Sequence, residues 1–239
     1  MKEQNNIVAG RNSVYEAMKS GRDIDRLIIQ KNSGRTLKDL LKLARENRIP
    51  IRYESKESLD RLYPGQHQGV VAYVAAYKYS DFEELFQEEE LPFIVVLDNI
   101  EDPHNLGAIL RSCDGAGATG VIISKDRAVG LTSTVAKVSA GAIEHVKVAR
   151  VTNISRAIED LKKRGIWVAA CDMDGELYTE KDLTGPIAIV IGNEGKGISR
   201  LVQEKCDFSI SIPMMGKINS LNASNAAAVL MYEIRRQRR

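Results

Sequence analysis

Residues 187–198, with the sequence IAIVIGNEGKGI, decide the class of fold. Ile187–Ile191 is an unbroken hydrophobic run, which is typical of a strand buried on both faces. Three glycines within six positions follow it, and they would let the backbone approach a ligand closely. The P-loop order G-x-x-x-x-G-K-[ST] is not met, because Lys196 precedes Gly197. The stretch predicts a buried strand that leads either into a ligand-binding turn or into a simple turn before a helix.

Four similar hydrophobic runs occur in the same part of the chain. They are Phe93–Leu97, Gly120–Ile123, Trp167–Ala170 and Phe208–Ile212. Helical patterns lie between the runs, including Ile154–Arg164 and a final helix over about Asn222–Arg236. Strands buried on both faces and separated by helices predict an α/β fold, a mostly parallel sheet with helices on both faces.

The charge distribution predicts three segments. The net charge is +6 over residues 1–78, −6 over 79–92 and +2 over 93–239. The first segment also alternates short strand and helix patterns, so we expect a small α/β domain there, followed by an acidic linker and a larger domain. A basic domain favours polyanions such as nucleic acid, and a solvated charged surface is the alternative.

Composition argues against several classes of protein. The cysteines Cys113, Cys171 and Cys206 are odd in number and far apart, so we expect reduced thiols in a cytoplasmic protein and neither a disulfide framework nor a zinc cluster. Three histidines without an H-x-x-x-H pair make a metal site improbable. No apolar stretch reaches the ~18–20 residues of a membrane span, and the N-terminus lacks the apolar core of a signal peptide.

Ligands of open parallel sheets bind beyond the carboxyl ends of the strands, so the segments that follow the strands are the candidate sites. After Phe93–Leu97 comes Asp98–Arg111, which has carboxylates, amides and a proline where a nucleotide-binding turn would have glycines. Asn105 suits the N-cap of the next helix. Arg111 lies on an otherwise apolar helical segment, so we expect it to be paired or to point into a site.

The segment before the last helix is unusually polar. Five hydroxyl or amide side chains crowd into it, Asn219, Ser220, Asn222, Ser224 and Asn225, whereas capping needs one or two. The others need a ligand or a hydrogen-bond network. The helix itself carries a seam of mostly small residues at Ala223, Ala226, Ala227, Leu230, Met231 and Ile234, which predicts tight packing or a homodimer contact.

With these segments in view, the chain resembles the SpoU-type (TrmH-type) RNA 2′-O-ribose methyltransferases of the knotted SPOUT superfamily. The three motifs of that family resemble DPHNLGAILR (102–111), IGNEGKGI (191–198) and IPMMGKINSLNASNAA (212–227). The stretch HQGVVA (67–72) is similar to the substrate domain of bacterial enzymes that methylate a guanosine ribose in large-subunit rRNA. The resemblance covers nearly the whole chain, and it alone implies a knot, because periodicity does not reveal one.

The resemblance implies transfer of a methyl group from S-adenosylmethionine to the ribose 2′-hydroxyl of a guanosine in structured RNA. It implies that backbone groups at Gly192, Ile212 and Leu221 hold the cofactor, without a metal. The extra N-terminal domain favours 23S rRNA over tRNA as the substrate. We also expect a homodimer through the C-terminal helix, and no DNA or membrane partner.

For catalysis, the resemblance points to Arg111 as the residue that activates the ribose hydroxyl, supported by Asn105, Glu194, Ser220 and Asn222. A guanidinium is protonated at neutral pH, which leaves two interpretations open. Either a buried Arg111 loses its proton beside an RNA phosphate, or it stays cationic and stabilises the developing alkoxide while another group takes the proton.

Several expectations follow for other residues. The N-terminal domain is expected to bind RNA through a basic face that includes Arg11, Arg22, Arg26, Lys31 and Arg35. The basic tail Arg235–Arg239 either contacts RNA or is a solvated, unstructured end. Asn225 stands where the family often has a small apolar residue, which puts the packing of the third motif in doubt. The competing functions are a tRNA 2′-O-ribose methyltransferase and a non-catalytic RNA-binding or ribosome-assembly factor, and the order of the glycines disfavours a nucleotide-dependent α/β enzyme.

Overall fold

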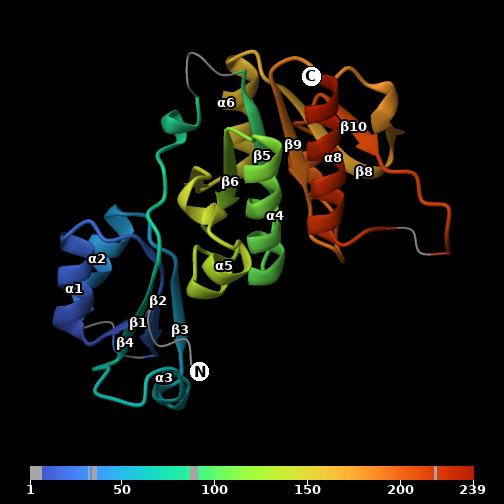
Figure 1. Ribbon diagram of the computed structural model, residues 1–239. Helices are drawn as coiled ribbons and strands as arrows, with labels where there is room; N and C mark the ends of the chain where they lie inside the picture. The colour runs from blue at the N-terminus through green and yellow to red at the C-terminus, as the bar shows by residue number, and fades with distance from the viewer. Residues whose placement is uncertain (1–6, 32, 34–36, 87–90, 218–219) are drawn as a thin grey trace. The chain divides into compact units, whose positions relative to one another are not determined.

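The computed structural model describes residues 7–31, 33, 37–86, 91–217 and 220–239. These residues form two compact units, each with its own sheet (Figure 1). The first unit consists of residues 1–78 with 130–133, and the second of residues 79–129 with 134–239.

The first unit is a four-stranded mixed sheet in the order β1-β4-β2-β3, in which only β2 and β3 are parallel. Its elements in chain order are β1 (Ile7–Ala9), α1 (Arg11–Lys19), β2 (Ile24–Gln30), α2 (Lys38–Glu46), β3 (Ile51–Glu54), α3 (Lys56–Leu62) and β4 (Val70–Val74). Helices α1 and α2 cover one face, and Leu59 of α3 packs on the other face against Ile28 and Val71. The predicted α/β character is confirmed, whereas β1 and α1 were not predicted.

The second unit contains a six-stranded sheet in the order β10-β8-β9-β5-β6-β7, and every neighbouring pair is parallel. Its strands are β5 (Phe93–Leu97), β6 (Gly120–Ser124), β7 (Val148–Val151), β8 (Trp167–Leu177), β9 (Ile187–Ile191) and β10 (Phe208–Ser211). Its α-helices are α4 (Pro103–Ala116), α5 (Ser133–Val138), α6 (Ile154–Lys163), α7 (Arg200–Gln203) and α8 (Ala223–Gln237). All five predicted strands are present, and the short edge strand β7 was missed.

Successive side chains of a strand point to opposite faces, which explains why the strands are hydrophobic throughout. On one face, Ile94 and Val96 of β5 pack with α6 and α7. Helices α4 and α8 lie side by side against the other face, in contact with β6 and β9 (Figure 1). The 3₁₀ turn η3 (Phe82–Leu85) places the fully buried Leu85 in the α6 side of the core, so the first half of the acidic stretch 79–92 is packed structure.

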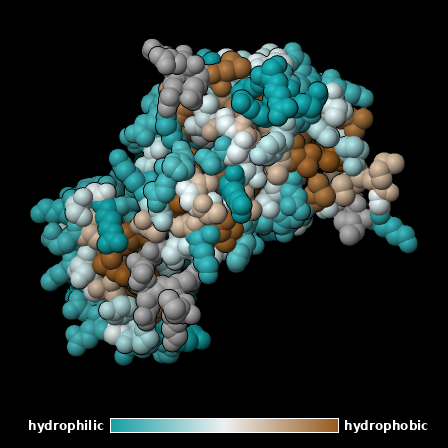
Figure 2. Space-filling view, in the orientation of Figure 1, coloured by the Kyte–Doolittle hydropathy of each residue, from teal (hydrophilic) through white to brown (hydrophobic). Residues whose placement is uncertain are grey.

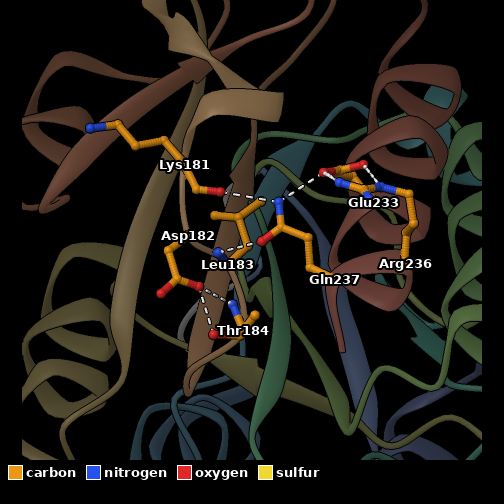
Figure 3. Close-up of polar contacts among 7 residues, drawn as sticks. All are labelled: Lys181, Asp182, Leu183, Thr184, Glu233, Arg236 and Gln237. Carbon is orange, nitrogen blue, oxygen red and sulfur yellow. Dashed lines mark hydrogen bonds and ion pairs between the residues drawn. The ribbon is translucent and has the colours of Figure 1, made fainter. Parts of the chain in front are cut away.

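The C-terminal end of α8 is fixed to the loop that precedes β9 (Figure 3). Gln237 Nε2 donates to the carbonyl oxygen of Lys181 (3.0 Å), and the amide of Leu183 donates to Gln237 Oε1 (2.8 Å). Arg238 Nη2 donates to the carbonyls of Pro92 (3.0 Å) and Gly185 (2.6 Å). The basic tail is therefore helical as far as Gln237 and anchored through Gln237 and Arg238, not an unstructured end.

Hydrophilic residues predominate on the face seen in Figure 2, and hydrophobic areas on it are small. Among the described residues, no helix is long and apolar enough to span a bilayer. Within the same residues, no group of three or more His, Cys, Asp or Glu side chains is placed to bind a metal ion.

Glu233 predicts an acid-dependent contribution to stability. Its nearly buried carboxylate accepts from Arg236, which lowers its pKa from 4.5 to about 2. A lowered pKa stabilises the folded state above about pH 4.5, and this stabilisation is lost as the pH falls through about 2. Glu233→Gln should reduce the free energy of unfolding by about 1 kcal/mol at pH 7, and the gap from the wild type should close towards pH 2. Urea titrations across this pH range would measure the difference, with Glu180→Gln as an exposed control. A difference in the free energy of unfolding that did not depend on pH would contradict the lowered pKa of Glu233.

Candidate active site

A cavity of about 490 Å³ lies beyond the carboxyl ends of β8, β9 and β10. Strands β8 and β9 are paired as far as Ala170 and Val190, and β8 then leaves the ladder. The pairing of β10 with β8 jumps from Ala170 to Glu176, so Cys171–Gly175 bulges out of the sheet. This bulge forms one wall of the cavity, which explains why the site lies at this end of the sheet.

The three residues predicted to hold the cofactor all line this cavity. Gly192 belongs to the turn after β9, and Ile212 and Leu221 to the segment after β10. Part of that segment, Ile218 and Asn219, lies outside the described residues. Two chain turns that are distant in sequence thus meet at one hollow.

The turn Gly192–Ser199 is held closed by its own backbone and by Asn193. Asn193 and Gly197 exchange backbone hydrogen bonds of 3.1 and 2.7 Å, and the Gly195 amide donates to Asn193 Oδ1 (2.9 Å). A Cβ on Gly192 would overlap backbone atoms of Gly197 and Ile198, so this position tolerates only glycine. The turn is a compact cavity wall and not a simple passage into a helix.

A second network joins this turn to the end of β5. The buried carboxylate of Asp98 accepts from the Ser199 amide (2.7 Å) and from Asn99 Nδ2 (2.8 Å). Asn193 Nδ2 in turn donates to the carbonyl of Asn99 (3.1 Å). Sequence reasoning missed these three positioning residues. The sequence signal that could have identified them is Asp98, a carboxylate directly after a fully buried strand, because a buried charge needs hydrogen-bond partners.

Three predicted catalytic side chains form one hydrogen-bonded cluster at the cavity. Asn105 Nδ2 donates to Glu194 Oε1 (2.9 Å), and Asn222 Nδ2 donates to Asn105 Oδ1 (3.0 Å) and to Glu194 Oε1. The Ala223 amide points to the same Glu194 oxygen (3.4 Å). We call Asn105, Glu194 and Asn222 the amide–carboxylate cluster.

The predicted N-cap role of Asn105 is wrong. Asp102 caps α4, because its Oδ1 accepts from the His104 amide (2.8 Å), and Pro103 occupies the first helical position. Asn105 therefore lies inside the first turn of the helix, buried and free to bind Glu194. Asn222 does cap α8, since its Oδ1 accepts from the Ser224 amide (2.9 Å), and its Nδ2 remains for the cluster.

The other two predicted catalytic residues are placed differently. Ser220 is exposed and lines the cavity. Arg111 is exposed on α4, about 9 Å along the helix axis from Asn105, and does not line the cavity. Asn225 is exposed, so the departure from the family pattern does not disturb the buried side of α8. The structure thus brings Asn105, Glu194, Ser220 and Asn222 to one place and leaves Arg111 outside it.

The cavity lining suits a cationic ligand. Asp172, Asp174 and Glu194 line it together with one cation, Lys196. Asp172 is fixed by Gln203 Nε2 (2.8 Å) and by the amide of Asp174 (2.9 Å). Burial, and to a lesser extent the charge of Asp172, raise the pKa of the Cys171 thiol to about 11, so this thiol is uncharged at physiological pH.

The second unit matches a known family. The sequence profile described as the SpoU rRNA Methylase family matches residues 92–232, well over half of the chain. The chain belongs to the SpoU rRNA methylase family. A second profile, described as RNA 2′-O ribose methyltransferase substrate binding, matches residues 7–80.

Individual members of the SpoU family align over most of the chain. YacO of Bacillus subtilis (strain 168), assigned to the TrmH family of tRNA/rRNA methyltransferases, is 50% identical over 100% of this chain and 98% of its own. The SpoU methyltransferase AviRb of Streptomyces viridochromogenes, crystallised with AdoMet, is 28% identical with a TM-score of 0.63, covering 97% and 90% of the two chains. The A. aeolicus TrmH/SpoU tRNA modifying enzyme is 30% identical with a TM-score of 0.58, covering 66% and 80%.

These matches establish an RNA methyltransferase that depends on S-adenosylmethionine, and they confirm the predicted SPOUT fold class with its N-terminal substrate-binding domain. The cavity fits that cofactor. Its volume is in the range of small-molecule sites, Gly192 lets the turn that lines it close tightly against Gly197 and Ile198, and its acidic side chains match a sulfonium.

Gly192→Ala should abolish cofactor binding, because the added methyl group displaces the turn that lines the cavity. Gly195→Ala is the matched control in the same turn, since its Cβ would lie 3.6 Å from Asn193 Oδ1, an ordinary contact. Isothermal titration with S-adenosylmethionine should show at least a tenfold loss of affinity for the first variant and less than a threefold change for the second. Equal affinities in two folded variants would contradict the assigned role of the turn.

Proposed function

We propose that this protein methylates the ribose 2′-hydroxyl of a guanosine in structured RNA, with 23S rRNA as the substrate. The observation that supports this most strongly is the amide–carboxylate cluster beside the cavity. It presents a fixed carboxylate and two amides next to the cavity that we propose holds the cofactor. Bound there, through backbone groups at Gly192, Ile212 and Leu221, the cofactor supplies an electrophilic methyl group.

Glu194 is suited to receive the hydroxyl proton. Its Oε1 is occupied by Asn105, Asn222 and the Ala223 amide. Its Oε2 has no hydrogen-bond partner among the described residues, and the residue lines the cavity. The two asparagines hold the carboxylate in place, so Oε2 can accept from a ribose hydroxyl while that oxygen is aligned for an in-line transfer. Ser220 lines the same cavity and can orient the ribose.

Arg111 acts as a cation in this proposal. A guanidinium is protonated at neutral pH, and Arg111 is exposed on α4. A cationic Arg111 binds an RNA phosphate beside the target ribose and stabilises the alkoxide that develops on the 2′-oxygen. The proton then goes to another group, for which Glu194 is the candidate.

The predicted division of the chain fits this function. Residues 1–78 would bind the RNA, the stretch 79–92 would connect the two parts, and residues 93–239 would carry out the transfer. The match to the substrate-binding profile over residues 7–80 supports the first role. The A. aeolicus tRNA modifying enzyme aligns over only 66% of this chain, so the additional substrate-binding domain distinguishes this protein from that tRNA enzyme and supports rRNA as the substrate.

We further propose a homodimer and a knot. The small-residue seam of α8 is mostly buried within the chain, so a dimer would use the outer side of α4 and α8, where Tyr232 is 54% exposed and its hydroxyl lies against Gly115. Light scattering should give twice 26.5 kDa for the wild type and a lower mass for Tyr232→Asp. The knot implied by the SPOUT resemblance would bring together the turn 191–198 and the segment after β10, from which Ile212, Met214, Ser220 and Leu221 line the cavity.

Arg111→Ala should lower the rate of methyl transfer by at least 100-fold, because the phosphate contact and the alkoxide stabilisation are lost together. The affinity for S-adenosylmethionine should change less than threefold, since Arg111 does not line the cavity. Arg156→Ala, which removes an exposed arginine from α6 on the opposite face of the sheet, is the control. A normal rate in Arg111→Ala would remove this residue from the mechanism.

Ribose methylation mapped across all RNA, from cells with and without the gene, tests the substrate. We expect one guanosine of 23S rRNA to lose its 2′-O-methyl group without the protein. Loss of a 2′-O-methyl group from a tRNA instead would contradict the proposed substrate but would agree with the proposed reaction. No change in any RNA, together with RNA binding and no binding of S-adenosylmethionine, would favour a non-catalytic assembly factor.

A further inference from the structure

Two hollows on the first unit share Arg11 as a common wall. One, of about 490 Å³, is also lined by Lys56, Gln66 and Gln68. The other, of about 630 Å³, is also lined by Asn12, Tyr15 and Lys38. Each has a volume in the range of small-molecule sites. We call this pair of hollows the Arg11 groove.

The wall formed by Gln66 and Gln68 is rigid, because a buried histidine fixes the loop that carries them. His67 is 4% exposed, its Nδ1 accepts from the Gly69 amide (3.0 Å), and its Nε2 therefore carries the proton that is donated to Asp60 Oδ1 (2.8 Å). Gln68 adopts a left-handed backbone (φ 50°), and its Oε1 accepts from the Arg11 amide (3.0 Å). The loop geometry is thus set before any ligand binds.

Arg11 is held in position with its charged end available. Its Nε donates to the Gln68 carbonyl (3.2 Å), whereas its two terminal nitrogens have no partner among the described residues. Lys38 and Lys56 are exposed and form no ion pair with the part of the chain that the structure describes. Of the carboxylates in the hollows, Asp60 is engaged by His67. Asp39, the other carboxylate that lines the hollows, is exposed. The groove therefore offers three cations to an anionic ligand, against two carboxylates of which one is engaged by His67.

The remaining groove residues match the chemistry of nucleotides. Tyr15 offers a ring on which a base can stack, and the amides of Asn12 and Gln66 can hydrogen-bond to base edges. Cations separated by such groups are typical of surfaces that bind unpaired RNA, because the bases of a duplex are not accessible in this way.

The other cations predicted for RNA binding lie elsewhere. The Arg26 guanidinium lies 4.4 Å from the centre of the Tyr73 ring, so it is already engaged. Arg22 and Lys31 are exposed but line neither hollow, and Arg35 lies outside the described residues. Arg11 is thus the predicted RNA-binding residue that the structure places in a formed groove.

We propose that the Arg11 groove binds an unpaired segment of the substrate RNA, with Arg11 on the phosphate between two nucleotides whose bases occupy the two hollows. The inference rests on the proposed function, because that function makes RNA the ligand. It adds the place of recognition and the single-stranded form of the segment that is recognised.

The test measures binding of the full-length protein to a fluorescein-labelled, unstructured 12-nucleotide RNA of mixed sequence, and to the duplex of the same sequence. Wild-type protein should bind the single strand more tightly than the duplex. Arg11→Ala and Lys56→Ala should each weaken single-strand binding by about tenfold and reduce the slope of log Kd against log salt by about 0.7. Lys19→Ala, an exposed cation at the other end of α1, should change it less than twofold.

The Lys56 side chain forms no hydrogen bond or ion pair with the described residues, so Lys56→Ala tests the groove even if Arg11→Ala does not fold. Wild-type affinity in Lys56→Ala and in a folded Arg11→Ala, or tighter binding of the duplex than of the single strand, would overturn the proposal. S-adenosylmethionine affinity and methylation mapping report on the proposed function separately. A variant that binds the cofactor normally but not the single strand supports the groove, whatever the identity of the methylated nucleotide.

Discussion

The site depends on one interaction, the hydrogen bonding of Glu194 to the amides of Asn105 and Asn222. The three residues come from the first turn of α4, the turn after β9 and the start of α8, and Asn105 is separated from them by 89 and 117 positions in sequence. A carboxylate held by two amides fixes the turn after β9 against the first turn of α4 and the start of α8, two helices that also pack against each other. The loss of one partner would leave a polar group unsatisfied and the cavity wall free to move.

In the proposed mechanism, the same turn serves cofactor and substrate. Gly192 allows the backbone to pass close to Gly197 and Ile198, and the next residues place Glu194 at the cavity. Asp98 and Asn99 connect this turn to the central strand β5. The Glu194 carboxylate is therefore anchored, through the turn, to the most buried part of the sheet. Under the proposed function, cofactor binding and proton acceptance would be coupled through a few residues of this turn.

Much of this arrangement could be predicted from the sequence, and the reasons are physical. Hydrophobic runs such as Phe93–Leu97 predicted the strands because strands covered on both faces tolerate no polar side chains. The rule that ligands bind beyond the carboxyl ends of parallel strands pointed to Glu194 and Asn222. The bulge Cys171–Gly175 could not be predicted, because it depends on the register between β8 and β10. The exposure of Arg111 could not be predicted either, because it depends on which side of α4 faces away from the sheet. Asn105 was given the wrong role since Asp102, three residues earlier, is an equally good cap.

The chemistry at the sugar is tested most directly by the position of the transferred methyl group. RNA that lacks the modification would be incubated with the protein and S-adenosylmethionine labelled with tritium in the methyl group, and then hydrolysed with alkali. A methyl group on the 2′-oxygen blocks cleavage of the adjacent phosphodiester, so the account predicts label in alkali-resistant dinucleotides that contain guanosine. Label released in mononucleotides would place the methyl group on a base and would contradict it.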